Sequence, residues 1–169
     1  MSFFKRLFGG GKKKSKIQKR NPFNLQVGDV VSYDLEDYIV IGKLVYNDSS
    51  YEWYAYQLDS GSKRIWLASE DDDEIILGIY ESTDLRLTNV PNEIEYKGQI
   101  FYLEEHGKAT ITTADGRVGA KTGQVMEYWD FESDNGDFLS VEKWGNEIEV
   151  SYGYPIDEHE LEFLPGSQE

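Results

Sequence analysis

The chain has 169 residues, a formal net charge of −15 and no cysteine. This length allows one good core or two small ones, and the lack of cysteine excludes disulfide bonds, thiolate metal sites and a cysteine nucleophile. No stretch approaches the roughly 20 consecutive apolar residues of a transmembrane helix, so we expect a cytoplasmic chain that does not span a membrane.

The N-terminus differs in charge from the rest of the chain. Met1 to Arg20 carry eight Lys or Arg and no acid, whereas residues 21–169 carry nine basic and all 32 acidic residues, a formal charge of −23. In a helix the large apolar residues of this segment would share one face. We interpret residues 1–23 as a basic amphipathic tail that contacts an anionic membrane surface. The expected contact residues are Phe3, Phe4, Lys5, Arg6, Leu7, Phe8, Lys12, Lys13 and Lys14.

Other interpretations of the tail stay open. It could be unstructured and solvated, or folded back on the acidic body. Nucleic acid is not an expected partner, because phosphate would repel a body of charge −23.

From Asn24 onward, short alternating or apolar runs are separated by turn residues. No segment of twelve residues has a convincing period of 3.6, although a short turn around residues 157–162 is compatible with the sequence. The chain is therefore expected to be all-β. The expected strands cover residues 30–33, 38–41, 53–58, 65–68, 75–80, 94–96, 100–103, 110–113, 125–131, 138–141 and 148–154.

These strands suggest an internal duplication. Residues 53–56 followed by Gly61 align with residues 128–131 followed by Gly136, and each set runs into a strand of the form aromatic-Leu-x-x-Glu, ending at Glu70 or Glu142. Since proline interrupts a strand ladder, the boundary falls near Pro91. We expect a first β repeat at residues 24–90 and a second at 91–169. They would form two related antiparallel sheets or small open barrels packed on each other.

The first repeat carries short motifs: Leu25-x-x-Gly28-Asp29-x-Val31, Tyr38-x-Val40-x-Gly42, Trp53-x-x-Tyr56-x-Leu58 and Trp66-Leu67-x-x-Glu70. With these motifs the chain resembles bacterial domain-of-unknown-function family 4178. It departs from the family pattern at Ala55, where an acid is expected. The second repeat has Asp130 at that position. The resemblance implies a β-rich domain without assigned activity, often encoded near phage-shock-type membrane-stress proteins and polyamine synthases.

Two acidic stretches are candidates for a cation site. The run Glu70, Asp71, Asp72, Asp73 and Glu74 could gather a calcium ion or a polyamine, but a solvated turn that blocks edge pairing is the more usual role of such a run. The stretch from Asp130 to Gly136 lacks the glycine position and final Glu of a calcium loop. We expect no metal, no cofactor and no catalytic residue.

Adjacent aromatic residues in the expected strands point to opposite faces. One of each pair should therefore lie outside the main core, where it is covered by loops or the other repeat, or forms a partner-binding surface. The candidates for such a surface are Trp53, Tyr54, Tyr128 and Trp129.

Together these patterns favour a non-enzymatic binding or adaptor module. Its tail would hold it peripherally on the inner face of the membrane, and its acidic aromatic face would engage a basic protein partner or a polyamine. A role in envelope stress or membrane maintenance follows from the resemblance alone. The alternatives are a small enzyme or enzyme-accessory protein with carboxylates in the groove between the repeats, or a wholly cytosolic acidic interaction domain. The oligomeric state stays open.

The tail interpretation is tested by co-sedimentation with vesicles. The full chain should pellet with anionic vesicles, pellet poorly with neutral ones, and release as salt rises. Changing Phe4 and Phe8 to Ser should weaken binding even in low salt, whereas changing Lys12, Lys13 and Lys14 to Ala should mainly alter the salt dependence. Equal pelleting of the full chain and a chain beginning at Asn21 would remove the support for membrane recruitment.

Overall fold

The computed structural model describes residues 18–166. In that part of the chain the regular structure is strand apart from one short 3-10 helix, so the all-β prediction is confirmed. No helix among these residues is long and apolar enough to cross a bilayer. In chain order the elements are β1 (Val30–Tyr33), β2 (Glu36–Asp48), β3 (Tyr51–Asp59), β4 (Arg64–Asp72), β5 (Glu74–Ser82), β6 (Glu93–Tyr96), β7 (Gln99–Gly116), β8 (Val125–Ser133), β9 (Phe138–Trp144), β10 (Glu147–Ile156), η1 (Glu158–Glu160) and β11 (Leu161–Leu164).

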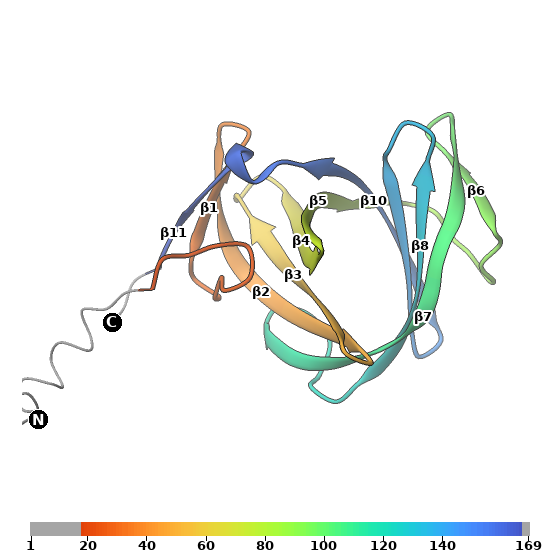
Figure 1. Cartoon of the computed structure of the whole chain (residues 1–169), viewed down its shortest axis with the longest axis horizontal. Coiled ribbons are helices and arrows are strands. Elements are labelled where there is room, and N and C mark those ends of the chain that lie inside the picture. The colour runs from red at the N-terminus through yellow and green to blue at the C-terminus, as the bar shows by residue number, and fades with distance from the viewer. Residues whose placement is uncertain (1–17, 167–169) are drawn as a thin grey trace, which may run out of the picture.

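The strands form one antiparallel sheet in the order β11-β1-β2-β3-β4-β5-β10-β9-β8-β7-β6. An additional pairing of β2 with β7 closes the strands from β2 round to β7 into an eight-stranded barrel, with β1 and β11 beyond β2 and β6 beyond β7. Figure 1 shows β1 to β5 on one side of the molecule and β6 to β8 on the other. The expectation of open barrels is therefore wrong, because the barrel is closed.

The closure depends on the length of β7. The sequence predicted two strands, 100–103 and 110–113, but a single strand, β7, covers both and passes through Gly107. A Cβ atom at Gly107 would lie 2.7 Å from the Tyr128 hydroxyl oxygen, so this glycine permits close packing inside a strand. The last part of β7 then reaches β2, where Gly42 to Asn47 pair with Gly116 to Thr110.

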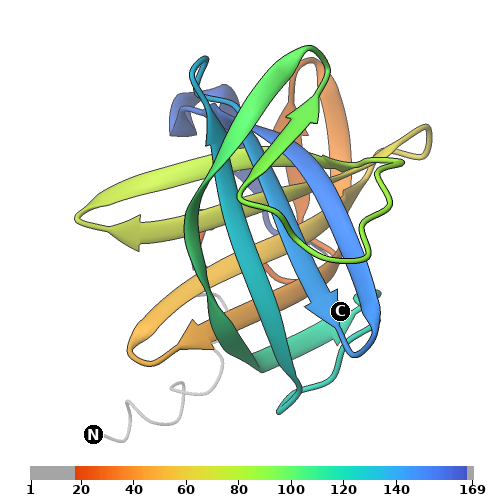
Figure 2. The same ribbon diagram turned by 90° about the vertical axis from the view of Figure 1, so that its right-hand side faces the viewer.

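Most barrel strands bury side chains on both faces. One face of each strand points into the barrel. Figure 2 shows that β2 to β5 cross the green and blue strands of the second half at a steep angle. The outer face of β2 to β5 carries a hydrophobic core outside the barrel. This core includes Tyr56, Leu58 and Leu67 and is covered by Leu25, β1 and β11. The outer face of β7 to β10 carries another hydrophobic core outside the barrel, which is covered by β6 and by apolar residues of the segment before β6. The interior is thus shielded on two sides.

The hairpins β3–β4 and β8–β9 have matching registers. Trp53 pairs with Glu70 in the first, and Tyr128 pairs with Glu142 in the second. Likewise Ala55 pairs with Ala68, and Asp130 pairs with Ser140. The β5 and β10 strands that follow the hairpins pair with each other. The duplication itself stays a prediction.

The folded body begins before residue 24, which the sequence took as its first residue. Arg20 and Asp29 form a buried ion pair in which the guanidinium Nε donates to a carboxylate oxygen 2.7 Å away. The same carboxylate accepts backbone N–H bonds from Gln26 and Gly166, so it joins the start and the end of the described chain. Farther along, Ser69 donates to the carbonyl of Pro22. Residues 20–22 belong to the body, and a deletion that tests the tail should stop at residue 17.

The buried pair yields a stability prediction. Changing Asp29 to Asn should destabilise the protein by about 3–5 kcal/mol, because it leaves the buried Arg20 guanidinium without a counter-charge. The exposed pair of Arg64 with Asp59 is the control, and Arg64→Ala should cost less than about 1 kcal/mol. Urea unfolding of the three proteins measures both values. Equal stability of the two variants would contradict the role given to the buried pair.

Candidate functional site

The closed barrel contains a cavity of about 770 Å³. Its lining comes from the inward faces of the barrel strands and from parts of the connections at their ends. A volume of a few hundred to about 1,000 Å³ is usual for sites that bind small molecules. The cavity is therefore large enough for a small organic ligand.

Aromatic rings form a large part of the cavity wall. The rings of Tyr46 and Trp53 stack with centroids 5.1 Å apart, and Trp53 meets Tyr128 edge to face at 5.2 Å. Trp144 lies 6.4 Å from Tyr46 on another side of this group. Small apolar residues such as Ala55 and Ala109 pack in the same cluster. Such a wall offers both apolar contact and the negative ring faces that attract cations.

Carboxylates line the same cavity in excess over basic groups. Among the described residues that line it, Arg86 is the one basic side chain. No three His, Asp or Glu side chains within residues 18–166 are grouped closely enough to hold a metal ion. The lining carboxylates are Glu70, Glu104, Glu105, Asp130, Glu132, Glu142, Glu147 and Glu149. The excess of carboxylates over basic groups favours a positively charged ligand.

Asp130 of β8 lines the cavity, and its side chain is exposed there although protein atoms crowd around it. Burial raises the pKa of its carboxyl to about 7, with further contributions from the nearby charges of Glu105, Glu70 and Glu142. None of the described residues donates a hydrogen bond to it. A carboxylate crowded by protein atoms and by other carboxylates, without a donor or counter-charge, is costly to keep ionised, and a bound cation would remove that cost.

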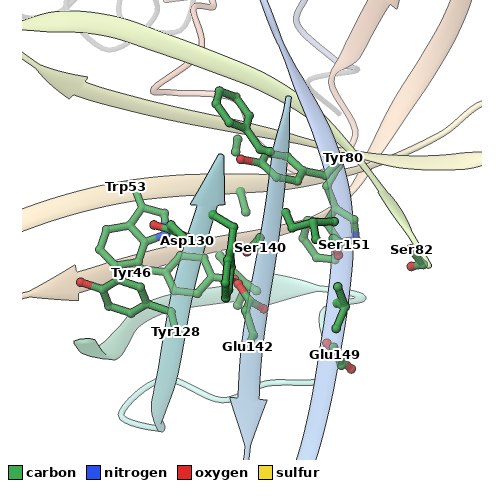
Figure 3. A pocket seen from close by; sticks show the side chains of 18 of the residues that line it. Tyr46, Trp53, Tyr80, Ser82, Tyr128, Asp130, Ser140, Glu142, Glu149 and Ser151 are labelled. Atoms are coloured by element: carbon green, nitrogen blue, oxygen red, sulfur yellow. The ribbon is translucent and has the colours of Figure 1, made fainter. Parts of the chain in front are cut away.

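Glu142 of β9 lies next to Asp130 in the cavity (Figure 3). Its carboxylate accepts hydrogen bonds from the Tyr46 hydroxyl at 3.2 Å and the Trp144 indole N–H at 3.1 Å. Burial and the charge of Glu149 together raise the pKa of Glu142 to about 7 in spite of these donors. The two hydrogen bonds fix the orientation of the carboxylate beside two aromatic rings.

Two tyrosines complete the polar surface of the cavity. Tyr51 donates a hydrogen bond to Glu70, a carboxyl whose pKa is raised by burial. Tyr80 stacks on Phe138, and none of the described residues forms a hydrogen bond with its hydroxyl. Burial raises the pKa of the Tyr80 hydroxyl, which therefore stays protonated and can donate to a ligand.

Comparison with known proteins agrees with the resemblance seen in the sequence. A family model described as "Domain of unknown function (DUF4178)" matches residues 26–158. The chain belongs to this family. An uncharacterized protein of Mycobacterium tuberculosis and one of Mycobacterium bovis are each 30% identical to it over 153 residues, which cover 85% of this chain and 73% of the relative. An uncharacterized protein of Aquifex aeolicus is 24% identical over 155 residues, 85% of each chain. No solved structure matches.

The structure of this DUF4178 protein separates the candidate residues that the sequence grouped. Trp53 and Tyr128 line the cavity, whereas Tyr54 and Trp129 lie on the outer faces of their strands, as the alternation predicted. Tyr54 packs edge to face on Phe23. These side chains therefore do not form one surface. The expected membrane-contact residues, Phe3, Phe4, Lys5, Arg6, Leu7, Phe8, Lys12, Lys13 and Lys14, lie outside the described residues.

The acidic run is also divided. Glu70 lines the cavity, whereas Asp71 to Glu74 are exposed around the β4–β5 turn, in which Asp73 has a φ of 69°. Asp130, Glu142 and Glu149 were not predicted from the sequence as a joint cation site. The signal for two of them was present, because Glu142 repeats the position of Glu70 and Asp130 supplies the acid that is missing at Ala55.

The raised pKa values lead to a prediction about stability and pH. Asp130 and Glu142 have pKa values of about 7 when folded and ordinary values of 3.8 and 4.5, so between these limits the folded state holds more protons. Their contribution to stability is therefore lost as the pH rises toward 7. The double variant Asp130→Asn, Glu142→Gln should melt at a higher temperature than the parent at about pH 8, and this difference should shrink below about pH 4.

The exposed Glu95→Gln on β6 is the control for this experiment, because it removes a charge outside the cavity. Thermal unfolding of the three proteins across the pH range measures the effect. A double variant that is less stable than the parent at every pH would contradict the burial cost assigned to the two carboxyls.

Proposed function

We propose that this protein is a non-enzymatic binding module whose barrel cavity holds a small organic cation. The observation that carries the proposal is Asp130, a carboxylate without a hydrogen-bond donor that faces an aromatic-walled cavity. Organic ammonium groups suit such a site because they combine a charge for the carboxylate with carbon surface for the rings. In this proposal the binding site is the cavity, instead of the exposed acidic aromatic face that we expected from the sequence.

Membrane attachment through the basic tail remains part of the proposal. What supports it is the charge contrast between Met1 to Arg20 and the body. Service in a bacterial envelope-stress or membrane-maintenance system rests on the family resemblance. In this scheme the tail recruits the protein to an anionic surface, and the barrel, whose net charge is negative, presents its cavity to cations that gather there.

We also infer that the cavity is built from two duplicated halves. What supports this inference is the matching register of the β3–β4 and β8–β9 hairpins, in which Glu70 and Glu142 are equivalent and both line the cavity. The halves differ where Ala55 corresponds to Asp130. The duplication would thus have produced a shell with one wall more acidic than the other.

A small enzyme is the second candidate, because carboxyls that titrate near neutrality are suited to general acid–base catalysis. Such an enzyme usually holds its acid and its base at separate pKa values. Burial raises the pKa of both Asp130 and Glu142 to about 7, and this direction assigns neither carboxyl as the acid or the base.

The binding proposal is tested with simple probes. Tetramethylammonium and butylamine should change the fluorescence of tryptophans in the cavity wall, Trp53, Trp66 and Trp144, in a saturable manner, whereas butyrate should not. Asp130→Asn should weaken the binding of both cations about tenfold, because it removes the unpaired charge. Glu95→Gln should leave it unchanged. Saturation by neither cation, or equal binding by the Asp130 variant, would overturn the proposal.

A further inference from the structure

Three carboxylates of the cavity form a row across neighbouring strands. Glu142 of β9 lies directly opposite Glu149 of β10. Asp130 of β8 lies opposite Ser140, two residues before Glu142, so Asp130 and Glu142 are diagonal neighbours. Figure 3 shows Asp130, Glu142 and Glu149 following one another along the cavity wall. The three carboxylates therefore follow one another across β8, β9 and β10, with Asp130 offset by two residues along its strand.

The length of the row exceeds the size of one ammonium group. Neighbouring strands lie about 4.8 Å apart, so β8 and β10 are separated by about 10 Å across the sheet, and the two-residue offset of Asp130 adds to its distance from Glu149. Like charges directly opposite each other in a sheet destabilise it, and the Glu142–Glu149 pair is such a case. A single cation at Asp130 would leave Glu149 at the other end without a counter-charge. Neutralising the whole row takes two or more separated positive charges.

The surroundings of the row leave space for a carbon chain between those charges. Ser140 and Ser151, which pair with each other beside the carboxylates, have small side chains that line the cavity. On another part of the wall, the stacked Tyr46 and Trp53 rings offer apolar contact. The unpaired Tyr80 hydroxyl supplies a further polar group at the cavity surface. Methylene groups would meet rings and small side chains, while amines would meet the carboxylates.

We propose that the ligand is a linear polyamine, an extended chain with a primary amine at each end, which lies across β8, β9 and β10. One amine pairs with Asp130 and another with Glu149, while Glu142 contacts the chain between them or a middle amine. This inference rests on the proposed function, since it names the class of cation that the barrel holds. A cavity of about 770 Å³ accommodates such a molecule but not a folded basic protein.

The test is a calorimetric titration of the full-length protein with amines of increasing length, at about pH 8 where the carboxylates are ionised. Butylamine has one amine, ethylenediamine has two that are close together, and cadaverine and spermidine span longer distances. Cadaverine and spermidine should bind at least about tenfold more tightly than butylamine, because they neutralise two members of the row. Ethylenediamine should gain much less over butylamine.

A substitution at one end of the row gives the second readout. Glu149→Gln should weaken spermidine binding about tenfold and leave butylamine binding unchanged, because butylamine uses the Asp130 end. The exposed Glu95→Gln is the matched control and should alter neither affinity. Thermal unfolding checks that both variants fold. The titration of the unchanged protein with the amine series tests the inference independently of the variants.

The outcomes separate this inference from the proposed function. Equal affinity for butylamine and spermidine, or an effect of Glu149→Gln on neither, would mean a site for a single ammonium group and would overturn the polyamine assignment alone. If ethylenediamine and cadaverine gained equally in affinity over butylamine, the site would recognise the number of charges and not the length of the ligand. This result would also overturn the polyamine assignment. Failure of every cation to bind, tetramethylammonium included, would overturn both proposals.

Discussion

The pairing of β2 with β7 is the constraint on which the site depends. Without it the strands would form an open, curled sheet, and side chains on its concave face would be bathed in water. The closure gives the sheet an inside, so that Asp130 and Glu142 face a cavity lined by protein instead of open solvent. Burial then raises the pKa of both carboxyls to about 7. The chemistry of the cavity therefore follows from a hydrogen-bonded contact between two strands that are far apart in the sequence.

The buried apolar side chains lie in three regions, which are two outer cores and the barrel interior. Two outer cores, one under β1 and β11 and the other under β6, bury residues such as Leu67 and Leu139 that are almost inaccessible to solvent. Each such side chain contributes about 1.5–3 kcal/mol relative to an exposed one. Because these outer cores stabilise the sheet, the interior does not have to be filled with apolar groups. A barrel with that support can hold a row of carboxylates that would weaken a structure with a single core.

Much of the fold could be predicted from the sequence, and the errors have physical causes. The strand at Val30–Tyr33 was predicted with its bounds, and the short helical turn at Glu158–Glu160 lies inside the predicted turn. The closure could not be predicted, because the register between strands that are distant in the sequence is set by tertiary packing. In addition, β7 passes through Gly107, and glycine is a residue type that commonly marks a turn. Nor could the inner face be chosen, since the strand from Tyr51 to Asp59 has aromatic residues on both faces and alternation alone does not distinguish them.

The row of carboxylates and the basic tail are consistent with one physical scheme. A barrel with ionised Asp130, Glu142 and Glu149 carries like-charge repulsion, and Arg86 is the one basic side chain among the described residues that line its cavity. Protons relieve that repulsion below about pH 7, and an organic cation would do so above it. A cation that binds only the folded barrel also stabilises it in proportion to its concentration. Anionic membrane surfaces concentrate both basic segments and free polyamines. A tail that attaches the protein to such a surface would therefore bring the cavity to the place where its proposed ligand is most abundant.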